Sequence, residues 1–160
     1  MAIITLNNNS LSSVTSLPAA IATGKVLQVS SIVQGATNQN IATTTYTDLT
    51  NMSINITPAS TSSKILVVAF VYARLQDAEG FGVQILRDTT DIYATPTYSI
   101  LADANPLHEL YTGGGFQYID SPSSTSQLTY KLQAATHDNL SVAFNPSVAS
   151  YMYLVELSSW

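Results

Sequence analysis

The sequence predicts an all-β protein, a jelly-roll-like antiparallel β-sandwich of about eight or nine strands. Uncharged polar residues (Ser, Thr, Asn and Gln) supply more than a third of the 160 residues, while charged residues supply only 9%. This composition suits the solvent face of strands, because exposed helix faces normally carry Glu and Lys. Short apolar or alternating segments recur every roughly 8 to 15 residues between turn residues, which is typical of a sandwich. The length fits one domain.

The first 24 residues differ from the rest of the chain. Their apolar residues are spaced too irregularly to define one face of a helix or strand. We predict an N-terminal arm over 1–24 and a sandwich domain over 25–160, with a frayed terminus as the alternative. The apolar side chains expected to anchor the arm on a partner are Ile3, Ile4, Leu6, Leu11, Val14 and Leu17.

The first half of the domain contains one segment that is apolar almost throughout, KILVVAFVYA at 64–73. A helix is the alternative for a run of this length, but its β-branched and aromatic residues favour a strand. Its lack of alternation predicts a strand covered on both faces. Residues 51–57 do alternate, which predicts one wet face. The strands expected in this half lie at 25–33, 43–49 with 51–57, 64–73, 80–87 and 92–95.

The second half begins with an expected long loop over 99–115, in which the glycines at 113–115 are interpreted as a flexible turn. Recognition residues are often carried by loops on a rigid scaffold, so this loop is a candidate contact surface. Its candidate contact residues are Leu107, His108 and Glu109. Further strands are expected at 116–120, 127–136, 140–144 and 151–157.

The sequence lacks the residues that several kinds of catalytic and metal-binding site require. The chain has no cysteine, which excludes disulfides, thiolate zinc sites and cysteine nucleophiles. The two histidines, His108 and His137, are far apart, and no serine lies in a G-x-S-x-G motif. The nearest acidic pairs, Asp77 with Glu79 and Asp88 with Asp91, are interpreted as turn residues rather than calcium ligands. We therefore expect no enzymatic activity, no catalytic residues, no cofactor and no metal.

Charge and hydropathy limit the classes of partner. The net charge is −5, and the five Lys and Arg residues are scattered, so nucleic-acid binding is not expected. The longest apolar stretch, 65–73, is too short for a membrane-spanning helix. The N-terminus does not match a signal peptide, which predicts synthesis and retention in a cytosol.

The aromatic residues suggest a contact surface. Nine tyrosines are present, and several fall in expected strands. A tyrosine ring covers apolar area and keeps a hydroxyl for hydrogen bonding, so such residues suit an interface or a sugar face. Interior packing is the alternative. The candidate interface residues are Tyr72, Tyr118, Tyr151 and Tyr153.

Three stretches carry a family resemblance: LNNNSLSSVTSLPAAIATGKVLQV, SINITPASTSSKILV, and the pair LRDTTDIY with YIDSPSSTSQLTYKLQ. Together they resemble small virion-surface β-sandwich proteins of tailed phages of marine bacteria and cyanobacteria. That family is similar to the tumour-necrosis-factor-like jelly-roll trimers, and its members include tail-fibre tips, head fibres and capsid decoration proteins. The resemblance implies a homotrimer on the virion exterior, made in the cytoplasm of a bacterial host.

Two functions follow as expectations. The first is a capsid decoration, or cement, protein that binds and stabilises the assembled shell, with the major capsid protein or another virion protein as partner. The second is a tail-fibre tip that recognises a host surface glycan or protein through its loops. A secreted enzyme or lectin of cellular origin is a third alternative.

Overall fold

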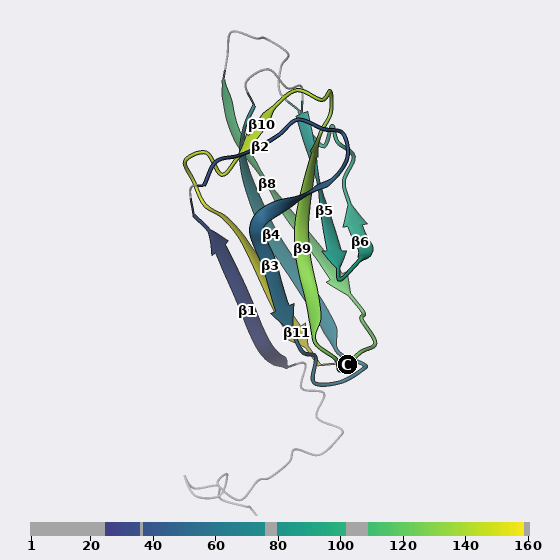
Figure 1. Cartoon of the computed structure of the whole chain (residues 1–160). Coiled ribbons are helices and arrows are strands. Elements are labelled where there is room, and N and C mark those ends of the chain that lie inside the picture. Colours follow the sequence, from purple (N-terminus) through teal and green to yellow (C-terminus); the bar gives the residue numbers. More distant parts are fainter. Residues whose placement is uncertain (1–24, 36, 76–79, 102–108, 159–160) are drawn as a thin grey trace, which may run out of the picture.

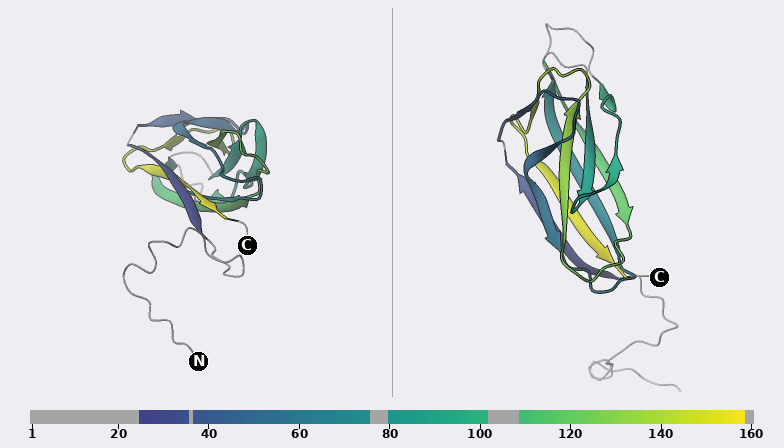
Figure 2. Two further views of the ribbon diagram at one scale, coloured as in Figure 1. Left: turned by 90° about the horizontal axis from the view of Figure 1, so that it is seen from below. Right: turned by 45° about the vertical axis from the view of Figure 1, so that its right-hand side comes forward.

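The computed structural model describes residues 25–35, 37–75, 80–101 and 109–158. All strands in these ranges belong to two antiparallel sheets that face one another as separate layers (Figures 1 and 2). No described residue is helical. The predicted all-β sandwich is therefore confirmed.

The first sheet, which we call sheet A, is built around the long strand β4. One side of β4 pairs with β11 and then, further along, with β10, while its other side pairs with β8. β1 pairs with β11 and β2 pairs with β10, so both lie in the next strand position. The strands of sheet A are β1 (Val26–Gln34), β2 (Gln39–Ile41), β4 (Lys64–Leu75), β8 (Leu110–Asp120), β10 (Val142–Phe144) and β11 (Ser150–Leu157).

The second sheet, sheet B, has the order β3-β9-β5-β6. The short strand β7 pairs with the start of β5, on the side where β6 pairs with its end. Sheet B comprises β3 (Thr47–Ile56), β5 (Gly80–Arg87), β6 (Thr90–Ala94), β7 (Ile100–Leu101) and β9 (Leu128–Thr136).

The strand order is that of a jelly roll. When β2, β7 and β10 are counted with the strands whose positions they continue, each sheet has four positions: β1-β11-β4-β8 and β3-β9-β5-β6. The chain crosses between the sheets from β3 to β4, from β4 to β5, and again around β8 and β9. These crossings place the first and last long strands, β1 and β11, side by side.

The core lies between the sheets and is filled by alternate residues of each strand. Along β4, every second residue from Ile65 to Leu75 is buried, and the residues between are half-exposed. The expectation that this strand is covered on both faces is therefore wrong within the chain, because sheet B covers only one face. The largest fully buried apolar side chains include Tyr130, Phe81, Phe144, Met52, Ile65, Leu75 and Ile85.

The glycine-rich segment is also a correction. Residues 113–115 lie in the middle of β8 and pair with Phe70 to Tyr72 of β4, so they form no turn. Strand β8 begins at Leu110, so the long loop expected over 99–115 ends before this residue rather than at 115. In the earlier half, the two segments expected around residue 50 are one strand, β3, with an irregular register between Asp48 and Ser53. Asn51 lies there with a φ of 58°, which Asn tolerates.

Some expectations concern residues outside the described ranges. They are the arm with its six anchor residues, the acidic pair Asp77 and Glu79, and the loop residues Leu107 and His108. Among the described residues no helix could span a membrane.

Candidate functional site

The outer face of sheet A is apolar and almost free of charge. The side chains that point outward come from alternate positions of β1, β11, β4 and β8. Along these four strands the only charged outward residues are Lys64 and Arg74, near the two ends of β4. The apolar outward residues are Val26, Leu27, Val29, Val33, Leu66, Val68, Phe70, Tyr72, Tyr111, Ile119, Tyr151, Tyr153, Val155 and Leu157.

Strand register arranges these side chains in rows across the sheet. Tyr151 lies beside Phe70, and their rings stack with centroids 5.5 Å apart. Tyr153 lies in the next row and packs against Tyr151 edge to face, at 5.4 Å. The three rings form a continuous aromatic ridge, and Tyr153 is its most exposed member at 38%.

A hollow lies beside this ridge, where β8 carries Gly115 in the same row as Phe70. Its volume is about 260 Å³. The next outward residue along β8 is Gln117, whose amide supplies a polar group at the rim. The lining residues are Val68, Ala69, Gly115, Phe116, Gln117 and Tyr151.

The outer face of sheet B is different, because polar side chains there pair with one another. Asp48 on β3 accepts hydrogen bonds from Lys131 Nζ (3.0 Å) and from Gln133 Nε2 (2.6 Å), both on β9. The hydrogen bonds from Gln133 and Lys131 lower the pKa of the Asp48 carboxyl. Thr129 Oγ1 donates to Asn55 Oδ1 at 2.9 Å. This face satisfies its own polar groups in contact with water, so the two sides of the sandwich differ in what they can bind.

The structure separates the four candidate interface tyrosines. Tyr72, Tyr151 and Tyr153 all lie on the outer face of sheet A. Tyr118 points to the other side of β8, where it packs against the core and its ring lies 5.7 Å from that of Tyr93. Tyr118 therefore does not share a face with the other three.

Sequence reasoning missed several members of this face. Phe70 and Val68 were assigned to a doubly covered strand, and Gly115 was assigned to a turn. Alternation was the available signal: in VLQVSSIVQ at 26–34, every second residue is exposed in the fold. That signal could not be read on β4, because both of its faces are apolar.

Of the three loop contact residues, only Glu109 is described. Its carboxylate lies 3.7 Å from Arg74 Nη1 and accepts a hydrogen bond of 3.3 Å from the Tyr111 hydroxyl. These contacts tie the start of β8 to the end of β4, so Glu109 has a local structural role.

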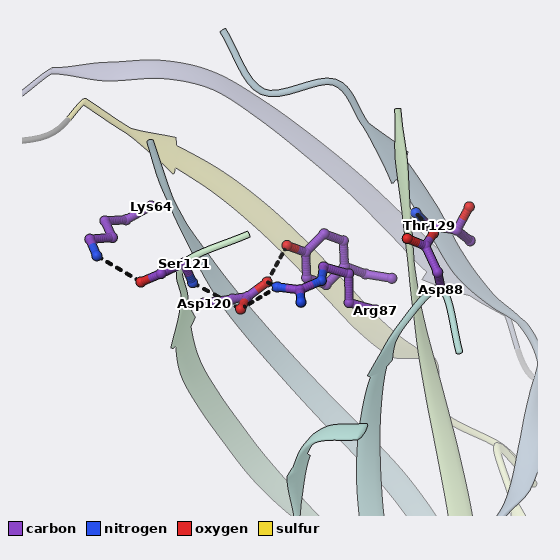
Figure 3. A network of polar contacts seen from close by, with 7 residues as sticks. Lys64, Arg87, Asp88, Asp120, Ser121 and Thr129 are labelled. Atoms are coloured by element: carbon purple, nitrogen blue, oxygen red, sulfur yellow. Dashed lines mark hydrogen bonds and ion pairs between the residues drawn. The ribbon is translucent and has the colours of Figure 1, made fainter. Parts of the chain in front are cut away.

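A polar cluster links the two sheets at one end of the sandwich (Figure 3). Asp120 on β8 accepts hydrogen bonds from Arg87 Nη1 at 2.7 Å to both carboxylate oxygens. The hydroxyl of fully buried Tyr130, on β9, donates to Asp120 Oδ2 at 2.6 Å. Burial and the Asp120 carboxylate raise the pKa of Tyr130 well above its usual range, so it stays protonated. Figure 3 also shows Ser121, which donates its N–H to Asp120 and accepts from Lys64.

A second buried carboxylate, Glu156 on β11, fastens the end of the sandwich near the β3–β4 connection. Its oxygens accept hydrogen bonds from Gln28 Nε2 (2.6 Å) and from the Ala59 N–H (2.7 Å). Burial acts to raise the pKa of this carboxyl, but the nearby Ser63 hydroxyl and the hydrogen bonds from Gln28 and Ala59 hold it below its usual value. Both buried acids are held by donors within the fold, which is the arrangement of a structural group.

The remaining titratable groups of the described residues do not match the ligand set of a metal site. No cluster of three or more His, Cys, Asp or Glu able to hold a metal ion is found in the part of the chain that the structure describes. His137 lies with its Nδ1 3.4 Å from Thr97 Oγ1 and its ring against Tyr98. The outer face of sheet A is therefore the candidate functional site.

Comparisons with known proteins do not assign the chain to a family. No family model matches the sequence, and no curated protein matches it. Among solved structures, the chain is similar to dimeric latent PorU from Porphyromonas gingivalis, with 11% identity and a TM-score of 0.39. The match covers 86% of this chain and 14% of the PorU chain.

A second similar structure is that of infectious bursal disease virus, Gx strain, with 10% identity and a TM-score of 0.37. The match covers 82% of this chain and 40% of the viral chain. The chain thus spans well under half the length of both.

Proposed function

We propose that this protein is a non-enzymatic structural protein of a virion exterior, a homotrimeric capsid decoration protein that binds and stabilises the assembled shell. The observation that carries this proposal is the wide apolar outer face of sheet A, which has charges only near the ends of β4. Soluble monomers rarely expose a continuous apolar surface of this kind, and such surfaces mark protein–protein contacts. The resemblance of the sequence to phage surface proteins supports the virion as the location.

The mechanism is stabilisation by mass action. A protein that binds only the assembled lattice stabilises it by RT ln(1 + [L]/Kd), where L is the free decoration protein. Three linked copies make the second and third contacts effectively intramolecular, which raises the avidity of the whole trimer. Uncharged contacts of this type are insensitive to salt.

Light scattering at micromolar concentration tests the assembly. We expect a mass of about three chains, each of 17.1 kDa. A stable monomer would contradict the proposal.

Particle assays test the decoration role. Particles assembled without the protein should withstand heat less well, and adding the purified protein should restore their resistance. Hundreds of copies per particle are expected for a shell protein, and a few to a few tens would indicate a fibre instead. Particles of unchanged heat resistance would overturn the stabilising role.

A receptor-binding fibre tip is the second candidate. The observation that favours it is the exposure of Tyr98, Leu110 and Tyr111 at the end of the sandwich where β5 and β8 begin. Replacing Leu107, His108 and Glu109 with Gly-Ser-Gly separates the two functions. A decoration protein should still protect its particles, whereas a fibre tip should lose adsorption to the host at least tenfold.

A further inference from the structure

Among the described residues, nothing gives Gly115 a structural reason to be glycine. Gly113 and Gly114 differ, since a Cβ would press against the Phe70 ring at the first and against the Ile100 side chain at the second. A Cβ on Gly115 would meet nothing within 4 Å, and no described glycine has a positive φ. Glycine weakens the interior of a strand, and there it often marks a place where another molecule approaches closely.

The hollow above Gly115 has the size and lining of a side-chain socket. Its volume of about 260 Å³ lies below the roughly 300–1,000 Å³ of typical small-molecule pockets. The wall carries Tyr151 and Val68, and Gln117 offers one amide at the side. An aromatic ring with a polar tip matches this combination, because the ring covers the apolar wall while its hydroxyl reaches the amide.

The same face supplies such a ring. Tyr153 is the one strongly exposed large apolar residue on the two central strands, β4 and β11. It stands in the row of Val68 and Gln117, two strands from the hollow, which is about 10 Å at the usual strand spacing. Its edge-to-face contact with Tyr151 supports the ring in an outward position. One face thus carries both a projection and a socket that suits it.

The charge distribution favours a second copy of this chain over a different partner. The chain carries a net charge of −5, yet the carboxylate described beside this face is that of Glu109, just before β8, and it is paired with Arg74. Two copies can therefore approach through the four strands of this face without bringing unpaired acidic groups together. A dissimilar partner is commonly selected by complementary charge, which this surface does not offer.

We propose that Tyr153 of one copy inserts into the Gly115 hollow of the next copy, and this contact rests on the proposed function as a self-assembling protein. Each copy then gives its Tyr153 to the next copy and receives the Tyr153 of the copy before it, and repeated around a three-fold axis this contact closes a trimer. We choose this arrangement over a two-fold one, in which two copies would exchange the same contact, because the assembly proposed above is a trimer; a dimer in light scattering would overturn the three-fold arrangement.

Filling the hollow tests the contact. Gly115→Val adds a β-branched side chain where the fold has room, so the melting temperature should stay the same or rise. Self-association should weaken at least tenfold, measured by sedimentation over a dilution series. Gly35→Val is the matched control, since its Cβ also meets nothing within 4 Å but it lies after the end of β1 and does not line the hollow. It should associate like the natural protein.

Cross-linking tests which residues meet, because the chain contains no cysteine. A mixture of Ser31→Cys, which lies beside Tyr153, and Gln117→Cys proteins should give a mixed dimer with a short bis-maleimide, and Ser53→Cys on sheet B should give none. The absence of the mixed product from a protein that still self-associates would overturn the contact.

The outcomes separate the two proposals. If the natural protein is a trimer and Gly115→Val is equally stable as a trimer, the hollow is not in the interface and the contact is wrong, while the assembly proposal stands. If the natural protein does not self-associate, both are wrong.

Discussion

At the scale of single residues, two buried carboxylates decide how the ends of the sandwich are fixed. Asp120 holds Arg87 and Tyr130, which come from two different strands of the opposite sheet. Glu156 holds Gln28 and the backbone of Ala59. Each acid is useful only because its donors are in place, since an unpaired buried charge is strongly destabilising.

Removing Asp120 should therefore cost far more stability than removing an exposed acid. We expect Asp120→Ala to lower the free energy of unfolding by about 3 kcal/mol, the lower end for a broken buried pair, because Arg87 is partly exposed. Asp48→Ala is the control, and its exposed pair with Lys131 should contribute less than about 1 kcal/mol. Urea unfolding of both variants measures the difference, and equal losses would show that the cluster does not stabilise the fold.

Glu156 should make stability depend on pH. The pKa of Glu156 in the folded state is below its ordinary value. Its contribution to the free energy of unfolding is therefore complete at any pH above its pKa in the unfolded chain, and it is lost as the pH falls through its pKa in the folded protein. Unfolding curves between about pH 6 and pH 3 should thus lose stability in the natural protein. The loss should be smaller in Glu156→Gln, and an identical pH dependence would contradict this role.

At the scale of elements, β4 shows how one strand can serve two interfaces. Its odd-numbered residues fill the core, and its even-numbered residues form the centre of the outer face of sheet A. The apolar run in β4 predicts a strand covered on both faces, but among the described residues only sheet B covers it, on the core side. In the contact that we propose, a second copy supplies that cover.

Two neighbouring substitutions on β4 should therefore have opposite effects. Val67→Asp places a charge in the core and should abolish folding, because an unpaired buried charge costs several kcal/mol against a total stability of roughly 5–15 kcal/mol. Val68→Asp points outward and should leave a folded monomer. Circular dichroism and light scattering distinguish these states. A folded Val67→Asp protein, or a Val68→Asp protein that still assembles, would refute the division of the strand.

At the scale of the whole molecule, the two ends of the described sandwich lie side by side. Lys25 and Ser158 exchange two hydrogen bonds, which join these ends beside β1 and β11. The core formed by the described residues runs from Ile41 to Leu154.

Deleting residues 1–23 should leave a folded trimer that no longer attaches to its particle. The core and the outer face of sheet A stay intact, while the segment with the six apolar anchor residues is removed. Melting temperature, light scattering and co-sedimentation with particles measure the three properties. Full occupancy on particles after the deletion would identify the sandwich itself as the anchor.

The fold class and most strand positions follow from the sequence alone, because alternation and turn residues are local signals. The sequence also indicates four tyrosines for an interface, Tyr72, Tyr118, Tyr151 and Tyr153, but it does not show that Tyr118 lies on a different face from the other three. The face that each residue joins depends on how the strands pair and pack. Gln28 and Glu156 meet although 128 positions separate them, and Arg87 and Asp120 although 33 do. The order of the strands in the two sheets decides which of these distant residues meet. In the same way, the hollow at Gly115 forms because β4 and β11 place aromatic rings beside it.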